Sequence, residues 1–192
     1  MTAQTAAEDT VQEDATAEAF LRKDELSRQA SDCIKKHTMY AAVGGLVPLP
    51  LLEMVASSTI QLRMIAKLCD VYEVRFSENA VKSSISTLVA TVLPATGVGL
   101  AVSSLFRSVP VVGTAFGVIA MPTLVAATTY ALGKVFAWHF AKGGSTLDFK
   151  PEEMKERFKE EFEEGKRKAA DLVRGDKSDK EGKEGKTASA AA

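Results

Sequence analysis

The sequence is poor in cysteine and in aromatic residues, with two Cys, one Trp and three Tyr among 192 residues. Both cysteines, Cys33 and Cys69, lie in helix-forming sequence, which argues against a disulfide framework and suits a reducing compartment. The N-terminal stretch MTAQTAAEDTVQED has neither a basic region nor an apolar core. We therefore expect no secretory signal, and the acids of this stretch argue against a mitochondrial transit peptide.

Motifs that carry chemistry are scarce as well. The GKT at 185–187 lacks the earlier glycine and the preceding strand of a phosphate-binding loop. Cys33 and His37 have the i, i+4 spacing of helical metal ligands, but two ligands do not make a site. We expect no enzyme, no cofactor, no metal and no nucleic-acid partner. A hydrolase or lipid-modifying enzyme that uses Glu53 and His139 is a minor alternative.

Charge is sparse in the middle of the chain. Residues 38–142 contain four acids and seven bases, out of 25 acids and 24 bases in the whole sequence. The small, acidic residues 1–16 and the residues 174–192, rich in Lys, Glu and Gly, predict disordered ends. Between them we expect a helical domain over 17–142 and an amphipathic helix within 143–173.

The helices are predicted from apolar residues at three- and four-residue spacing. One helix is expected over about 17–43, ending at the glycines and prolines of VGGLVPLP, and a second from Pro50 to about Tyr72. Ser77 and Glu78 predict the start of a third, because serine caps a helix and an early acid suits its dipole. The predicted fold class is therefore all-α.

Two uncharged runs dominate the centre. They cover 24 residues from Ser83 to Phe106 and 26 residues from Ser108 to Gly133, and each is long enough for a transmembrane helix. We expect a membrane-associated helical bundle with a central apolar hairpin over about 83–141 and amphipathic flanking helices. A hairpin buried inside a soluble bundle is the alternative. Small residues that would let the arms pack closely are Ala95, Gly99, Gly113 and Gly117.

Positive charges set the expected topology. Lys82 precedes the first run, and Lys134 and Lys142 follow the second, so a spanning hairpin places all three on one side of the membrane. By the positive-inside rule, the chain would lie in a bacterial inner membrane with both termini in the cytoplasm.

The C-terminal helix is expected to begin at Pro151, because proline suits the first helical position. It carries an i, i+4, i+8 stripe of Met154, Phe158 and Phe162 among charged residues. This stripe is too narrow for a core helix, so we predict that these three side chains bind a cytoplasmic protein partner. Docking on the edge of the bundle and a solvated helix are the alternatives.

The stretches GLVPLPLLEMVASSTIQLRMIAKLCDVYEV, VPVVGTAFG and ATTYALGKVFAWHF resemble the bacterial domain-of-unknown-function family 697, which occurs in YcjF-like inner-membrane proteins and beside Era-type GTPases. The family commonly has glycine after the tyrosine, where this chain has Glu73, and no GTPase domain is attached. The matching residues, within 38–142, are Pro48, Pro50, Glu53, Gln61, Met64, Ile65, Tyr72, Pro110, Gly113 and Tyr130 to Gly133.

The resemblance implies a helical, membrane-associated module, with any GTPase supplied by a separate chain. Our leading hypothesis is a non-enzymatic inner-membrane protein that anchors or scaffolds a cytoplasmic partner, such as a GTPase or a membrane-remodelling assembly, and that could form a homo-oligomer. The alternative is a soluble helical bundle that shields its hairpin and inserts it into membranes in the manner of pore-forming toxins.

Overall fold

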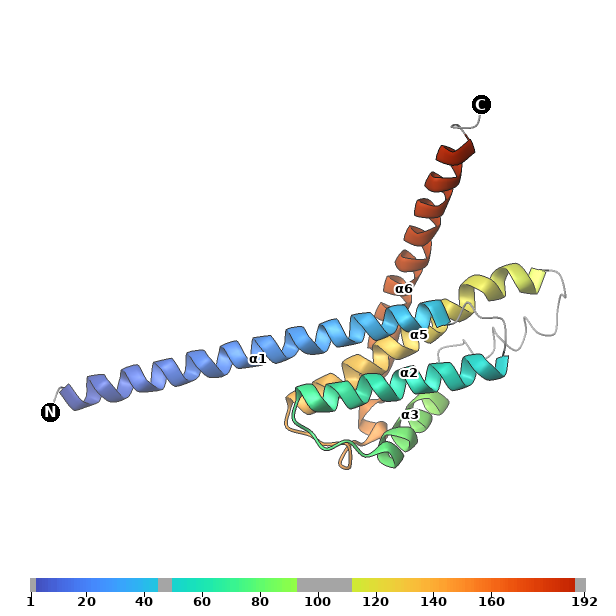
Figure 1. The fold of residues 1–192 in the computed structure, drawn as a ribbon. Coiled ribbons are helices and arrows are strands. Elements are labelled where there is room, and N and C mark those ends of the chain that lie inside the picture. The colour runs from blue at the N-terminus through green and yellow to red at the C-terminus, as the bar shows by residue number, and fades with distance from the viewer. Residues whose placement is uncertain (1–2, 45–49, 93–111, 189–192) are drawn as a thin grey trace.

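The computed structural model describes residues 3–44, 50–92 and 112–188, and describes side chains within 16–43, 58–90 and 122–171. Every element in these residues is a helix (Figure 1), which confirms the all-α prediction. The helices are α1 (Ala3–Gly44), α2 (Pro50–Val71), α3 (Glu78–Val92), α5 (Val112–Ala141) and α6 (Pro151–Ala188).

The helix starts at Pro50, Glu78 and Pro151 agree with the sequence analysis. The ends of the chain differ from it. Where disorder was expected over 1–16 and 174–192, α1 is helical from Ala3 and α6 is helical to Ala188. Residues 3–16 are rich in Ala, Gln and Glu, which are good helix formers. Residues 174–188 contain three glycines, and their sequence gives no such reason for a helix.

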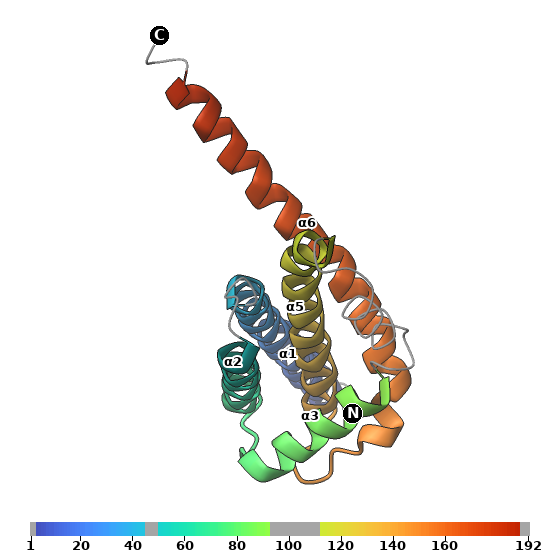
Figure 2. The ribbon, with the colours of Figure 1, turned by 90° about the vertical axis from the view of Figure 1, so that its right-hand side faces the viewer.

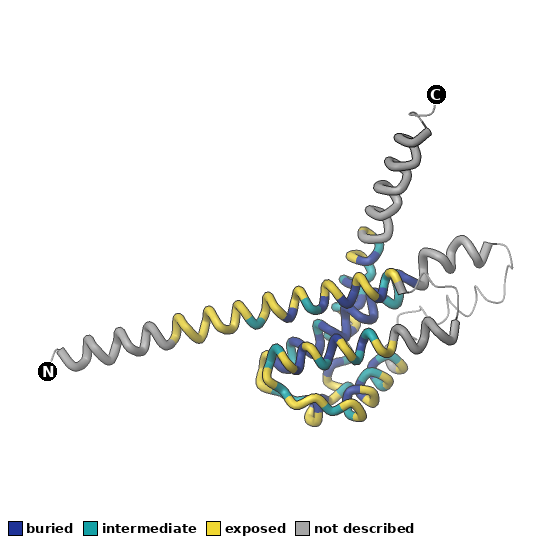
Figure 3. The backbone as a smooth tube through the Cα atoms, in the orientation of Figure 1, coloured by how far each residue is buried: buried dark blue, intermediate teal, exposed yellow. Residues whose placement is uncertain are grey.

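Helix α5 is the centre of the bundle. It contacts α1, α2 and α6, while α3 packs mainly on α6 (Figures 1 and 2). Residues 126–137 of α5 are buried except for Lys134, which is partly exposed, and the middle of the bundle is accordingly dark blue in Figure 3. The second half of the second uncharged run, predicted to be an arm of a membrane hairpin, is therefore enclosed by other helices of the same chain.

The other parts of the predicted hairpin are less fully described. Helix α3 ends at Val92, so Ala95 and Gly99 lie outside the described residues. Gly113 and Gly117 lie in the first turns of α5, where the structure describes the helix but not the side chains around it, so the prediction that they pack closely stays a prediction. Among the described residues, none of the helices is both long and apolar enough to cross a membrane.

Helix α2 closes at Glu73, whose backbone is left-handed with a φ of 56°. The N–H of Tyr72 donates to the carbonyl of Leu68 at 3.0 Å, and the N–H of Val74 donates to the carbonyl of Cys69 at 2.8 Å. Glycine is the preferred residue at such a helix end. The resemblance noted in the sequence leads us to expect glycine at this position, and this chain places a side chain there instead.

Replacing Glu73 with glycine is expected to raise the free energy of unfolding by about 1 kcal/mol, because a side chain in this conformation costs about 1–2 kcal/mol. The lost ion pair, Arg22 Nη2 to Glu73 Oε1 at 3.3 Å, joins two exposed side chains and contributes little. Urea denaturation of the full chain in mild detergent measures the change, with Arg22→Gln as the control for the ion pair. A loss of stability in Glu73→Gly equal to that in the control would contradict the argument.

Candidate functional site

Three helices meet at one level of the bundle, at Gly133 of α5. A Cβ placed on Gly133 would lie 2.8 Å from Cγ1 of Ile34 and 3.0 Å from Sδ of Met64. Both side chains are buried, and Cys33 Sγ lies 3.9 Å from the carbonyl oxygen of Met64. Helices α1 and α2 therefore press directly against the backbone of α5, which fixes the register of the three helices.

Basic residues adjoin this level on all three helices. We define the basic collar as Lys36 of α1, Arg63 and Lys67 of α2, and Lys134 of α5. Helix α1 ends, and α2 and α5 begin, at the same end of the bundle (Figures 1 and 2). We call this the apolar end, residues 37–44, 50–62 and 112–133, because Glu53 is its single Asp, Glu, Lys or Arg. The first base beyond the apolar end thus lies at one level on all three helices, although α5 is again uncharged over 135–141.

Helix α1 exposes apolar side chains at this end. Met39 is 48% exposed, Tyr40 50% and Val43 65%. Exposed apolar surface of this kind, gathered rather than scattered, marks contact with a membrane or a partner. The apolar end is therefore a candidate attachment surface bordered by the collar.

The family-like residues lie mainly inside the bundle. Gln61 is buried and its amide donates to Thr129 Oγ1 at 3.5 Å, and the ring of Tyr72 lies 6.2 Å from that of Phe140. Pro50 and Glu53 lie in the first turn of α2, where side chains are not described, and Pro48 and Pro110 lie outside the described residues. Those family-like residues whose side chains are described therefore serve to pack the helices together.

Tyr130 joins α5 to α6. Lys168 Nζ donates to the Tyr130 hydroxyl at 2.7 Å, the hydroxyl donates to Glu164 Oε1 at 3.0 Å, and Lys168 and Glu164 form an ion pair at 2.6 Å. Burial raises the pKa of Tyr130. Hydrogen bonds from Lys168 and Tyr130 lower the pKa of Glu164, and the bond to Glu164 raises the pKa of Lys168. This polar cluster fixes the later part of α6 on the bundle.

The prediction that Met154, Phe158 and Phe162 are presented to a partner is wrong. Phe158 and Phe162 are fully buried and Met154 is 7% exposed, all within the core cluster of the protein itself. Helix α6 packs against α5 and α3. A narrow stripe is enough to bury this helix because it lies at the edge of the bundle, where one face contacts two neighbours.

Small residues continue the stripe and were missed in the sequence. Gly165 and Ala169 are buried after Phe162 at three- and four-residue spacing. A Cβ on Gly165 would lie 2.9 Å from the carbonyl oxygen of Ala127 and 3.1 Å from Cδ1 of Tyr130. The spacing was visible in the sequence, but glycine gives no hydrophobic signal, so the close helix contact was assigned to other small residues.

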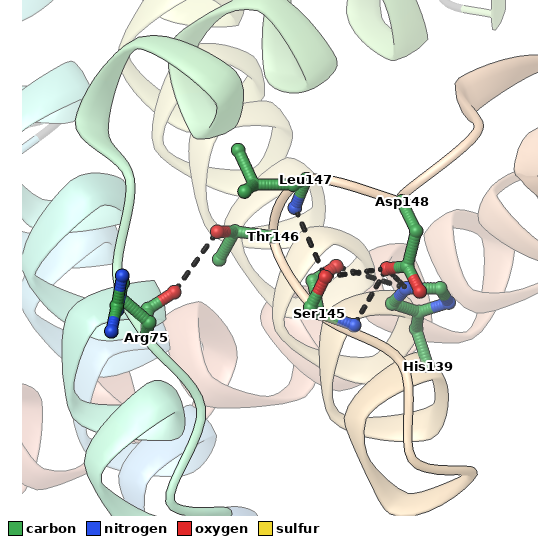
Figure 4. Close-up of polar contacts among 6 residues, drawn as sticks. All are labelled: Arg75, His139, Ser145, Thr146, Leu147 and Asp148. Carbon is green, nitrogen blue, oxygen red and sulfur yellow. Dashed lines mark hydrogen bonds and ion pairs between the residues drawn. The ribbon is translucent and has the colours of Figure 1, made fainter.

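A polar turn follows α5 at the opposite end of the bundle (Figure 4). Asp148 Oδ1 accepts hydrogen bonds from the Ser145 N–H at 2.6 Å and the Ser145 hydroxyl at 2.9 Å, and His139 Nε2 lies 3.1 Å from it. The bonds from Ser145 and His139 lower the pKa of Asp148 to about 2. Thr146 Oγ1 donates to the carbonyl of Arg75 at 3.0 Å, which ties the turn to the link between α2 and α3.

Ser145, His139 and Asp148 are the residue types of a hydrolytic triad, but their geometry is different. A nucleophilic serine must hydrogen bond to the histidine, whereas the Ser145 hydroxyl donates to Asp148 and His139 Nε2 faces Asp148 and the carbonyl of Ser145. His139 also lies at the end of α5, away from the start of α2 that carries Glu53 (Figure 1). In this arrangement the three residues hold the turn closed.

The two thiols are free. Burial raises the pKa of Cys69 to about 11 and also raises the pKa of Cys33, where Lys67 and Lys36 act in the opposite direction. Cys33 Sγ lies 3.7 Å from Nδ1 of His37. Within the part of the chain that the structure describes, no three His, Cys, Asp or Glu side chains gather as a metal site.

Comparisons with known proteins support the resemblance noted in the sequence. A family described as "Domain of unknown function (DUF697)" matches residues 11–167. Magnetosome membrane protein 22 of Magnetospirillum gryphiswaldense is 38% identical over 142 residues, which cover 73% of this chain and 72% of that protein. No solved structure matches the chain. The family match includes α2, α3, α5 and the whole basic collar.

Proposed function

This chain belongs to the DUF697 family, and on that premise we propose that it is a non-enzymatic membrane protein. In this proposal the apolar end attaches to a bilayer, and the rest of the bundle holds a protein partner at the membrane surface. The localisation proposed is a bacterial inner membrane, with the charged part of the bundle and both termini in the cytoplasm.

One observation carries this proposal: the first Lys or Arg beyond the apolar end occurs at the same level on α1, α2 and α5. The contacts of Gly133 with Ile34 and Met64 define that level, and the basic collar adjoins it. A membrane surface matches this pattern, because basic residues concentrate on its cytoplasmic side and exposed apolar groups enter the lipid. The relative named as a magnetosome membrane protein supports the same conclusion.

The partner is proposed from the family resemblance, which suggests a GTPase in trans or a membrane-remodelling assembly. The stripe on α6 is buried and is not available for such a partner. An exposed apolar pair remains on α1, where Phe20 is 72% and Leu21 66% exposed. We propose that this segment binds the partner, either a second protein or another copy of this chain. Affinity purification from mild detergent, with identification of co-eluting proteins, tests this part.

The second candidate function is a bundle that shields its apolar hairpin and inserts it on demand. The burial of Ala126 to Leu132 by α1, α2 and α6 favours it. The two functions differ in how firmly the resting protein is held. Alkaline carbonate should leave an attached protein in the membrane pellet and release a shielded one.

Replacing Phe116 and Ile119, both within the second uncharged run, with lysine is expected to move the protein from the carbonate pellet to the supernatant. Each lysine costs about 2.5–3.5 kcal/mol at the centre of a bilayer, so two should reduce membrane retention by at least a hundredfold. Fractionation and immunoblotting of cell membranes measure the change.

The matched control adds the same two charges on exposed residues of α1, as Ser27→Lys with Ser31→Lys. This variant should stay in the pellet with the wild type. Equal retention of both double variants would show that the uncharged run does not attach the protein, and release of the wild type itself would favour the shielded hairpin.

A further inference from the structure

An open groove lies between α1 and α2 beside the basic collar. We infer that this groove binds the phosphate group of an anionic phospholipid, an inference that rests on the proposed membrane attachment. The walls of the groove are His37 and Tyr40 from α1 and Ile60, Arg63, Ala66 and Lys67 from α2.

Unpaired positive charge surrounds the groove. Arg63 and Lys67 are one helical turn apart, so their side chains share a face of α2. Among the described residues, no carboxylate lies within ion-pair distance of either. Lys36 and Lys67 both act to lower the pKa of Cys33, against the effect of burial. A compact anion with several oxygens would satisfy this group of donors.

The acids of α1 and α2, with one exception, lie on the side of the groove that faces away from the apolar end. Asp32 is one turn before Lys36, and Asp70 is nearly one turn after Lys67. The exception, Glu53, is ten residues before Arg63, about 15 Å along the helix. On the side of the groove that faces the apolar end, the first acid on either helix is therefore Glu53.

The apolar wall favours a lipid over a free phosphate ion. Tyr40 is half exposed and meets the ring of His37 edge-on, with the ring centroids 5.9 Å apart. Ile60 and Ala66 add aliphatic surface to the α2 side. Tyrosine is enriched where headgroups meet hydrocarbon, and nearby bases attract anionic lipids. A phospholipid would contact the basic side chains of the groove with its phosphate and the apolar side chains with its glycerol and acyl chains. Inorganic phosphate would contact only the basic side chains.

Thermal unfolding of the full chain in mild detergent tests the inference. Phosphatidylglycerol, phosphatidylcholine and inorganic phosphate are added separately, and circular dichroism follows the transition. We expect phosphatidylglycerol to raise the midpoint and the other two to leave it nearly unchanged. In the double variant Arg63→Gln, Lys67→Gln, the apparent affinity for phosphatidylglycerol should fall about thirtyfold, from the lost attraction of two bases to an anionic headgroup.

The matched control is Lys155→Gln with Lys159→Gln, which removes two charges at the same spacing on α6 and should respond to phosphatidylglycerol as the wild type does. Equal stabilisation of the groove variant and the wild type would overturn the site. Stabilisation by inorganic phosphate as strong as that by phosphatidylglycerol would overturn the assignment to a lipid.

A separate measurement distinguishes this inference from the proposed function. In carbonate extraction the groove variant should stay in the pellet, because the apolar end and not the groove attaches the protein. Release of the wild type by carbonate would contradict the proposed attachment. The lipid titration in detergent does not depend on that attachment and would still decide whether the groove binds the phosphate group.

Discussion

Replacing Phe162 with alanine is expected to lower the free energy of unfolding by about 3–5 kcal/mol, the usual cost of removing a buried aromatic ring. Phe162 has no exposed surface, and its ring lies 6.2 Å from that of Phe158 in a nearly parallel orientation. Because a domain is stable by only about 5–15 kcal/mol, this change should shift the urea midpoint strongly. Fluorescence of Trp138, the one tryptophan of the chain, follows the transition in mild detergent.

The control for this experiment is Phe20→Ala, which removes the same ring from a position that is 72% exposed. Its effect on unfolding should stay within about 0.5 kcal/mol. The comparison also separates the two interpretations of the α6 stripe. If Phe162→Ala kept its stability but lost a protein partner, the stripe would be a binding surface and its burial in the bundle would be wrong.

The starts of α2, α3 and α6 were predictable because local chemistry sets them, whereas α1 begins earlier than expected and the start of α5 had no such signal. Pro50 and Pro151 are the first residues of α2 and α6, where the backbone N–H has no partner within the helix and proline therefore costs nothing. Ser77 precedes α3 and is a preferred residue for capping a helix start. The end of α2, expected at about Tyr72, lies at Val71. The left-handed conformation of Glu73 was not visible, because glycine normally marks it. Burial was harder still, because a helix that is apolar on all sides looks the same in sequence whether protein or lipid surrounds it.

The level of the candidate site depends on register, which a single sequence does not contain. Lys36, Arg63 and Lys134 are far apart along the chain, and each alone is an ordinary surface base. Their common level is set by the contacts of Gly133 with Ile34 and Met64. The uncharged runs that suggested a membrane were visible from the start. The common level of the first bases on three helices required the packed structure.

Replacing Gly165 with leucine is expected to lower the free energy of unfolding by about 2–3 kcal/mol and to move α6 away from α5. The nearest atoms to a Cβ at this position are the carbonyl oxygen of Ala127 at 2.9 Å and the Cα of Ala127 at 3.0 Å. Both belong to the backbone of α5, so a side chain cannot rotate aside to make room. Leucine is a better helix former than glycine by up to about 1 kcal/mol, and a loss of stability can therefore come only from packing.

Trp138 reports directly on the contact that Gly165→Leu should break. The guanidinium of Arg157, on α6, lies 4.5 Å from the centre of the Trp138 ring on α5. Separation of the two helices should expose the ring to water and shift its fluorescence to longer wavelength before the protein unfolds. Lys159→Leu adds the same side chain on the exposed face of α6 and should change neither emission nor stability. Emission and urea midpoint equal to the wild type in Gly165→Leu would mean that α5 and α6 do not approach each other this closely.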